Sequence, residues 1–327
     1  MQRLAIGIDI GGQSSKCGVV TEDGTILEQS VVTSLIDSFD EYLELLAGTV
    51  KDLVRKTADR GVAVGIGIGA PNANRLDGTI RYAPNLRWAR GADGKPGIVH
   101  LADRLKEATG LHVRITNDAN AAARGERTYG VARGINDFIM ITLGTGVGSG
   151  IISHGRLVYG HDGFAGELGH VCVVPGGGGR QCNCGLRGCL ETYASATGVA
   201  YSAREILGMD PRDSLLRKLD PLKISSKDIY DAAVKGDVIA KDIFAFTGRI
   251  LGRALADFVK FSSPQAIVLF GGLTKAREFF HDEMVKAMDD NLMQIWKGQI
   301  QILYSSLKES DAAILGASSM VWSPDEV

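Results

Sequence analysis

One histidine and three cysteines in a glycine-rich stretch have the spacing of a metal site. The stretch reads GHDGFAGELGHVCVVPGGGGRQCNCGLRGCLE over residues 160–191, and its candidate ligands are His170, Cys182, Cys184 and Cys189. One imidazole and three thiolates complete a tetrahedral zinc site and leave no position for water, which is typical of a structural ion. The alternative is a group of small buried or oxidised cysteines, and the tight clustering favours zinc over it. Cys172, inside an apolar run, is interpreted as an ordinary core thiol.

Polar side chains in loops could hold the hydroxyl groups of a sugar. Glu167 and Glu191 flank the predicted metal site, so a loop pinned by the metal would position both carboxylates for a polar substrate. The full set of such loop residues is Asn74, Asn85, Asn117, Glu167, His170 and Glu191.

Glycine turns follow three apolar strands and bring backbone N–H groups close to any bound oxyanion. The residues concerned are Asp9, Gly11, Gly12, Ser14 and Lys16 in the first turn, Gly144, Thr145 and Gly146 in the second, and Gly271 and Gly272 in the third. One glycine turn is a weak signal, but two at matching places in the chain indicate a polyphosphate ligand. The third turn could run alongside the base and ribose of a nucleotide. The chain has 42 glycines without a repeat, and we assign this excess to turns and ligand loops.

Asp118 lies at a predicted strand-to-helix junction and has two interpretations. Phosphoryl transfer requires positioning, Mg²⁺ and a base for the attacking hydroxyl, and a carboxylate can be that base. Aspartate is also favoured as a simple N-cap of a helix, which would give Asp118 only a structural role.

The order of predicted elements occurs twice along the chain. Three strands in a row (Leu4–Asp9, Lys16–Val20 and Thr25–Thr33) precede a helix after Ser38, a strand at Val62–Ile68, a helix at Ile98–Thr109, a strand at Val113–Thr116 and a helix from Ala119. The pattern restarts with strands at Phe138–Leu143, Gly148–Ser153 and Arg156–Tyr159, helices near 191–207, 226–235 and 237–261, a strand at Ala266–Phe270, a helix at 275–297 and a strand at Ile300–Tyr304. Such a duplication predicts two similar α/β lobes with a cleft between them. We expect the lobes to span 1–117 with 309–327 and 118–308, because the last helix, Ser310–Trp322, should return to the first lobe.

The composition excludes several classes of protein. The 327 residues suffice for two domains, and the net charge of -2 gives no support for binding to nucleic acid or a membrane surface. Five cysteines, three of them clustered, fit a reducing compartment better than a disulfide framework. Neither a signal peptide nor an apolar span is visible, so we expect a cytoplasmic protein without a membrane partner.

The sequence resembles the ROK family of sugar kinases and repressors over nearly its whole length. The most specific part is Glu167-Leu-Gly-His170 followed by the Cys182–Glu191 segment, which looks like the family signature and its zinc site. The resemblance implies duplicated ribonuclease-H-like lobes of the actin-like ATPase fold with an interdomain cleft. It also implies ATP, Mg²⁺ and structural zinc as cofactors, and a homodimer, which is common in the family.

The same resemblance implies roles for individual residues. Asn117-Asp118-Ala-Asn120 matches the catalytic segment, which makes Asp118 the general base. Asn117, Glu167, His170 and Glu191 would bind sugar hydroxyls, so that His170 would serve both the sugar and the zinc through its two nitrogens. One departure concerns the first phosphate segment, where the family usually has threonine and this chain has Gln13. Ser14 or Ser15 could supply the missing hydroxyl.

Two classes of function compete for this sequence. The first is an ATP-dependent kinase acting on the 6-hydroxyl of a hexose, with glucose as the expected substrate and N-acetylmannosamine, mannose and fructose as alternatives. The second is a sugar-sensing transcriptional regulator. Family repressors carry an N-terminal DNA-binding domain, and the position of Asp9 near the start of the sequence favours the kinase.

Overall fold

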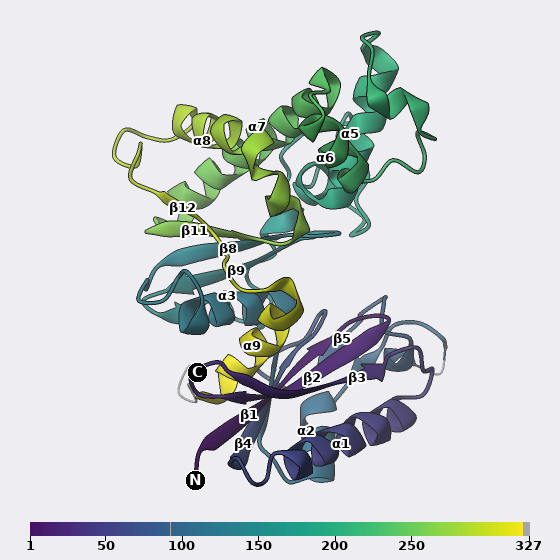
Figure 1. Ribbon diagram of the computed structural model, residues 1–327, viewed down its shortest axis with the longest axis vertical. Coiled ribbons are helices and arrows are strands. Elements are labelled where there is room, and N and C mark those ends of the chain that lie inside the picture. The colour runs from purple at the N-terminus through teal and green to yellow at the C-terminus, as the bar shows by residue number, and fades with distance from the viewer. Residues whose placement is uncertain (92, 323–327) are drawn as a thin grey trace. The chain divides into compact units, whose positions relative to one another are not determined.

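The computed structural model describes residues 1–91 and 93–322 (Figure 1). Contacts divide the chain into two compact units. The first comprises Met1–Asn136, Gly150–Gly166 and Ser305–Val327, and the second comprises Asp137–Ser149 and Glu167–Tyr304.

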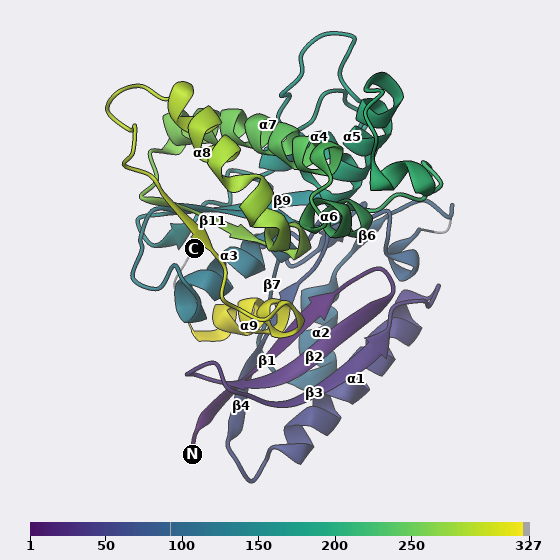
Figure 2. The ribbon, with the colours of Figure 1, turned by 45° about the horizontal axis from the view of Figure 1, so that its top comes forward.

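The first unit is an α/β layer structure built on one mixed sheet. Its elements are β1 (Arg3–Ile10), β2 (Ser14–Thr21), β3 (Ile26–Thr33), α1 (Phe39–Lys56), β4 (Val62–Gly69), β5 (Ile80–Arg81), β6 (Ile98–Val99), α2 (Leu101–Thr109), β7 (Val113–Thr116), α3 (Asp118–Tyr129) and α9 (Glu309–Trp322). The sheet order is β3-β2-β1-β4-β7, in which β1 pairs antiparallel with β2 and parallel with β4. Helices α1 and α2 cover one face, and α9 covers the other and packs against α3 (Figure 2).

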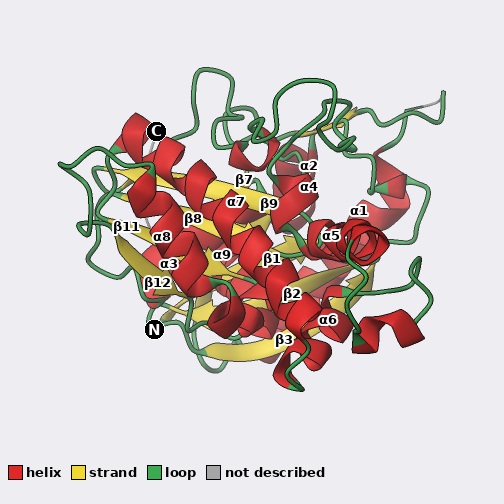
Figure 3. Cartoon of the chain, turned by 90° about the horizontal axis from the view of Figure 1, so that it is seen from above, coloured by secondary structure: helices red, strands yellow, loops and turns green. Residues whose placement is uncertain are grey.

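The second unit repeats this plan. Its elements are β8 (Phe138–Leu143), the start of β9 (Val147–Ser153), α4 (Glu191–Ala194), α5 (Ala196–Met209), α6 (Ser226–Val234), α7 (Val238–Ser262), β11 (Ala266–Phe270), α8 (His281–Asp290) and β12 (Gln301–Tyr304). With the short β10 (Arg156–Leu157), the strand order is β10-β9-β8-β11-β12, which is the order of the first sheet. Helix α7 packs against α8 and α5, and Figure 3 shows these helices covering one face of the strands. The predicted duplication and the α/β fold class are therefore confirmed.

Several predicted boundaries differ from the structure. The expected helix at Ile98–Thr109 begins at Leu101, because Ile98–Val99 form β6, which pairs with β5. The helix expected over 275–297 is instead a 3₁₀ helix (Gly272–Phe279) followed by α8, and α8 ends at Asp290.

The helix expected over 191–207 is also interrupted. Ser195 is extended and buried between α4 and α5, and its hydroxyl accepts a hydrogen bond from Gly198 N–H, so this residue caps a new helix rather than continuing the old one.

Helix α3 belongs by its contacts to the first unit, so this unit extends to Asn136 instead of ending at Asn117. The cause is close packing of α3 on α9, where a Cβ on Gly125 would lie 2.9 Å from Gly316 Cα. The lobe bounds of 1–117 with 309–327 and of 118–308 stay a prediction, and residues 323–327 lie outside the described residues. The predicted return of the last helix to the first unit is confirmed.

The glycine excess has a second use besides turns and ligand loops. Gly7 and Gly67 are paired on β1 and β4 under α9, where a Cβ would lie 2.1 Å from Ile314 O and 1.9 Å from Ala317 O, respectively. A helix can approach the sheet so closely only above residues without side chains. The assignment of the whole excess to turns and ligand loops was therefore wrong.

Candidate active site

Asp118 lies at the start of α3, but it is not the residue that caps this helix. The N-cap is Asn117, whose Oδ1 accepts a hydrogen bond from Ala119 N–H at 2.8 Å. Asp118 Oδ1 accepts from the same N–H at 2.8 Å, and the side chain is exposed. Because Asn117 already caps the helix, the simple N-cap interpretation of Asp118 does not explain its carboxylate.

A second carboxylate, Asp9, lies near Asp118 in the first unit. Burial, the charge of Asp118 and the opposing effect of Lys16 together raise the pKa of Asp9 to about 6. Crowding by protein atoms also raises the pKa of Asp118, although its side chain remains accessible to solvent. A buried carboxylate whose ionised form is disfavoured by a second carboxylate makes a site where a cation or a proton is stabilised.

The first glycine turn joins β1 to β2 through a hydrogen bond from Gly11 N–H to Ser14 O at 3.0 Å. A Cβ on Gly12 would lie 2.9 Å from Asn85 O, so the absent side chain allows the predicted sugar residue Asn85 to approach the turn. Ser15 is buried and its hydroxyl is engaged with Ser34 and Tyr42. Of the two serines considered as a replacement for the family threonine, only Ser14 is partly exposed.

Asn74 is buried, and its side chain holds the loop around it. Its Nδ2 donates to Asp162 O at 2.6 Å, and its Oδ1 accepts from Leu76 N–H at 2.9 Å. The structure thus gives Asn74 a role in fixing two loops, and its direct contact with a sugar remains a prediction.

The four predicted metal ligands converge in the second unit. The ligand atoms of His170, Cys182, Cys184 and Cys189 all lie within 4.8 Å of one another. Two of the contacts, from Cys182 Sγ to His170 Nδ1 and between the Sγ atoms of Cys184 and Cys189, are 3.7 Å long. A tetrahedron with Zn–S bonds of about 2.3 Å has edges of about 3.8 Å, so these separations fit zinc. Burial raises the pKa of the Cys182 and Cys189 thiols, and a bound dication would offset this cost of ionisation.

The start of β9 positions the predicted sugar residues of the second unit. Val147 N–H donates to Glu191 Oε2 at 3.0 Å, and Glu191 Oε1 lies 3.7 Å from Cys182 Sγ. A Cβ on Gly169 would lie 2.1 Å from Val147 O, so the glycine of the Glu-Leu-Gly-His sequence is needed for close packing on this strand. His170 directs Nδ1 to the cysteines, and its Nε2 lies 3.9 Å from Glu167 Oε2.

Arg180, which sequence reasoning missed, anchors the loop of the predicted metal ligands Cys182, Cys184 and Cys189 (the metal loop) to α5. Its buried guanidinium donates to Glu205 Oε2 at 2.6 Å and to Ser202 Oγ at 2.9 Å, and it stacks between Tyr193 and Tyr201. A buried arginine with a carboxylate partner is a recognisable anchor in a structure, but the partner 25 residues away cannot be read from the sequence.

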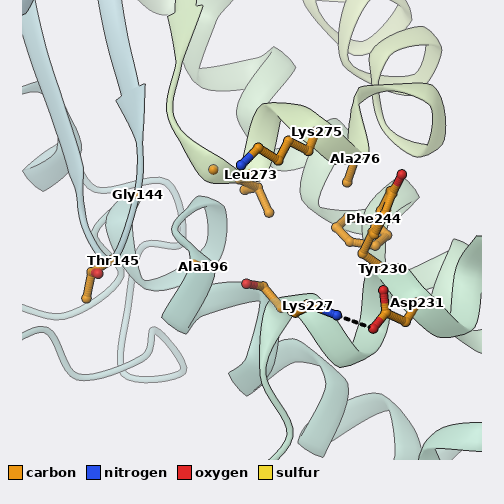
Figure 4. Close-up of a pocket in the computed structure, with 12 residues that line it drawn as sticks. Gly144, Thr145, Ala196, Lys227, Tyr230, Asp231, Phe244, Leu273, Lys275 and Ala276 are labelled. Carbon is orange, nitrogen blue, oxygen red and sulfur yellow. Dashed lines mark hydrogen bonds and ion pairs between the residues drawn. The ribbon is translucent and has the colours of Figure 1, made fainter. Parts of the chain in front are cut away.

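A cavity of about 520 Å³ lies within the second unit beside two of the predicted glycine turns. Figure 4 shows Gly144 and Thr145 at one end and Tyr230 and Phe244 at the other. The remaining lining residues are Ala196, Ser226, Lys227, Asp231, Gly272, Leu273, Lys275 and Ala276. Its size and its mixture of apolar walls with glycine turns suit a nucleotide.

Gly271 adjoins Gly272 of this cavity and has a part in strand packing, and its predicted contact with the adenosine stays a prediction. Its φ is 106°, and a Cβ there would lie 2.6 Å from Leu143 O, so it permits close contact between β11 and β8. The residues of α6 that line the cavity were not predicted, because an amphipathic helix pattern does not distinguish a cavity wall from a core face.

The duplicated α/β plan and a nucleotide-sized cavity with glycine turns at its edge define a phosphotransferase of the sugar kinase and actin-like class. A model of the ROK family matches residues 5–323. The glucokinase of Thermotoga maritima is 37% identical over 322 residues, which cover 97% of this chain and 96% of that protein. The chain therefore belongs to the ROK family.

Two further relatives represent the two functional classes. A ROK family glucokinase from Streptomyces griseus, solved in complex with glucose and AMPPNP, has a TM-score of 0.75 and 34% identity, covering 97% of this chain and 98% of that one. The xylose repressor of Caldicellulosiruptor bescii is 27% identical over 320 residues, which cover 97% of this chain and 77% of the repressor. Among the described residues, no helix is both long enough and apolar enough to cross a bilayer.

Proposed function

We propose that this protein is an ATP-dependent sugar kinase that transfers the γ-phosphoryl group to the 6-hydroxyl of a hexose, with glucose as its substrate. The observation that carries the proposal is the strand-to-helix junction at Asn117 and Asp118, where one residue caps the helix and leaves an exposed carboxylate beside it. Similarity to glucokinases of 34% and 37% identity over nearly the whole chain supports the choice of reaction and of glucose.

Asp118 acts as the general base. Its carboxylate accepts the proton of the 6-hydroxyl while the oxygen attacks the γ-phosphorus and ADP leaves. The raised pKa of this carboxylate makes it a better proton acceptor than an ordinary aspartate. Asn117, Glu167, His170, Glu191, Asn74 and Asn85 are the residues proposed to orient the sugar.

The cavity of the second unit takes the nucleotide. Gly144, Thr145 and Gly146 approach the phosphates, and Gly272 borders the adenosine. On the first unit, Gly11, Gly12, Ser14 and Lys16 are proposed to contact the transferred phosphate. Mg²⁺ suits Asp9, because its oxygens are hard ligands, and because burial and the neighbouring carboxylate disfavour its ionisation without a cation. When bound, the ion neutralises charge that develops on the phosphates.

Zinc is proposed as a structural ion held by His170, Cys182, Cys184 and Cys189. Support comes from the tetrahedral separations of the ligand atoms. The ion would fix the His170 ring, and it would fix the helix start that carries Glu191. These residues could then bind the sugar without rearranging.

The proposal extends to the cellular setting. The described cysteines are free thiols, which supports a reducing cytoplasm. The product, a hexose 6-phosphate, would enter glycolysis, and a homodimer is proposed from the family resemblance alone.

A panel assay tests the proposal directly. Glucose, mannose, fructose and N-acetylmannosamine are each offered with ATP and Mg²⁺, and ADP formation is coupled to NADH oxidation. We expect the highest kcat/KM for glucose. A higher value for another sugar would correct the substrate. Sugar binding by calorimetry without any ADP formation would instead support the regulator class.

A further inference from the structure

Cys172 differs from its predicted role, because its side chain is exposed rather than part of the core. It forms an isolated antiparallel bridge with Cys189, one of the proposed zinc ligands. The residue after Cys172 donates to the carbonyl before Cys189 at 2.8 Å, and the residue after Cys189 donates to the carbonyl before Cys172 at 2.9 Å. The two cysteines are therefore a non-hydrogen-bonded pair, in which the side chains lie on the same face of the strands.

This backbone pairing brings the two cysteines to a spacing that a disulfide can bridge. Cα atoms of such a pair are about 4.5 Å apart, and disulfides join Cα atoms separated by about 4.4–6.8 Å. The thiol of Cys172 also lies close to the opposite strand, because a Cβ on Gly188 would be 3.2 Å from its Sγ. Cys189 itself is buried, with its Sγ 3.7 Å from that of Cys184.

We propose that Cys172 is an oxidation site, and that its disulfide with Cys189 removes a zinc ligand and opens the metal loop. The inference rests on the proposed zinc site. Cys172 is the accessible partner, since it is exposed and is not one of the four converging ligands. Cys17, which is buried in the first unit, offers no comparable access.

The chemistry requires a peroxide as oxidant. The sulfur of Cys172 attacks one oxygen of hydrogen peroxide, the O–O bond breaks, and a sulfenic acid and water form. The sulfur of Cys189 then attacks the sulfenic sulfur, so that the S–S bond forms, the S–O bond breaks and the departing hydroxide takes up a proton. Overall, the Cys172 thiol and the zinc-bound Cys189 thiolate lose two electrons and one proton, solvent supplies a second proton, and one peroxide becomes two waters.

The functional consequence follows from the position of Cys189. It precedes the start of α4, where Glu191 accepts from Val147 N–H and lies 3.7 Å from Cys182 Sγ. Loss of zinc would release Cys182 and His170 together. The side chains of His170 and Glu191, which are proposed to orient the sugar, would then be less fixed. The oxidised protein should therefore lose sugar affinity, and a thiol reductant with zinc should restore it.

The test uses zinc-loaded protein exposed to hydrogen peroxide after removal of reductant. Released zinc is followed with a metallochromic dye, free thiols are alkylated, and disulfides are mapped by peptide mass spectrometry. We expect the Cys172–Cys189 cross-link to form in step with zinc release, at one zinc per disulfide. Protein that carries no zinc before oxidation would refute the proposed zinc site. This outcome is distinct from the disulfide mapping, which tests the oxidation of Cys172.

The variant Cys172→Ser decides the role of this thiol. It should bind zinc and turn over like the parent, yet keep most of its zinc over the period in which the parent loses it. Cys17→Ala is the matched control and should behave as the parent does. A first disulfide among Cys182, Cys184 and Cys189, or equally fast zinc loss from Cys172→Ser, would overturn the proposal.

Discussion

Asp118 shows how a single residue can be interpreted differently once its neighbour is seen. From the sequence, helix capping and catalysis are both reasonable for an aspartate between a strand and a helix. In the structure Asn117 makes the capping hydrogen bond, and the Asp118 carboxylate is left exposed with a raised pKa. The family resemblance pointed to the same residue, and the cap geometry adds that Asn117 can cap the helix without Asp118.

Replacing Asp118 tests its role as the base. Asp118→Asn keeps the size of the side chain, and the helix cap at Asn117 is untouched. The variant should fold and bind sugar and ATP, while kcat falls by roughly two to four orders of magnitude. The measurements are kcat, the sugar Kd and Tm of one preparation. Turnover within a few-fold of the parent, with only a small stability loss, would show that the carboxylate is structural.

Asp9 should make stability depend on pH. Its folded pKa of about 6 lies above the ordinary value of 3.8, so the folded state binds this proton more tightly than the unfolded state. Stability therefore falls as pH rises from about 4 to about 6, by at most about 3 kcal/mol at about 1.4 kcal/mol per pKa unit. Asp9→Asn should raise Tm at pH 7.5 in Mg²⁺-free buffer, have little effect at pH 4, and abolish activity.

A control of opposite sign accompanies this prediction. Hydrogen bonds from Ser225 lower the pKa of Asp228 in a capping box, so its contribution is stabilising at neutral pH and is lost on acidification. Asp228→Asn should therefore lower Tm at pH 7.5. If Asp9→Asn also lowers Tm at pH 7.5, the ionised Asp9 carboxylate is stabilised by its surroundings, and the argument that burial raises its pKa fails.

Among the elements, the strands that contain glycines were located from the sequence, but the role of their glycines was not. Alternating or continuous apolar runs located β1, β4, β8 and β11 from the sequence, because buried strands have few polar residues. We assigned the glycine excess to turns and ligand loops and gave the glycines within β1 and β4 no role. Their purpose is to admit α9, which comes from the far end of the sequence, so no local pattern could reveal it.

The turn between β8 and β9 lines the proposed nucleotide cavity and contacts the start of α5. Gly144 O accepts from Ala196 N–H at 2.8 Å, and Thr145 O accepts from Thr197 Oγ1 at 2.6 Å, which fixes the turn against α5. A Cβ on Gly144 would meet no atom within 4 Å. The glycine is therefore not required by the fold, which favours a role in leaving space for a ligand.

Gly144→Val fills that space with a side chain the folded protein can accept. The KM for ATP should rise by at least about tenfold, since phosphate and valine would compete for one volume, while sugar binding without ATP stays near the parent value. Gly48→Val on α1, another exposed position with nothing within 4 Å, is the control and should change neither value. Impaired sugar binding with an unchanged ATP KM would mean that the turn serves the sugar.

At the scale of the whole molecule, the sequence contained the duplication and the four residues whose side chains converge as the predicted metal ligands. Both depend on the order and spacing of residues along the chain, which can be read from the sequence alone. The lining of the proposed nucleotide cavity and the partners of Arg180 could not be predicted from the sequence, because they depend on which faces of distant helices meet. The same holds for Asn74, whose burial follows from contact with a loop 88 residues away.

Each unit has an apolar core of its own, and neither core needs the metal. The cluster in the first unit includes Leu4, Tyr42 and Trp88, and that in the second includes Phe244 and Leu269, with zinc ligands in neither. Small zinc domains unfold without their ion because it replaces such a core. Here zinc is expected to order one loop of a protein that is already folded.

Removal of the metal should therefore separate sugar binding from folding. Cys184→Ala should lose the bound zinc, raise the KM for the sugar through Glu191 and His170, and lower Tm by roughly 4–8 °C for a loss of about 2 kcal/mol. The far-UV circular dichroism spectrum at about 20 °C should match that of the parent. Cys172→Ser is the control, since it removes a thiol of the same loop that is outside the ligand set, and it should keep zinc, Tm and KM. Global unfolding of Cys184→Ala would show that the ion supports the core, whereas parental stability and KM without zinc would show that the cluster has no structural role.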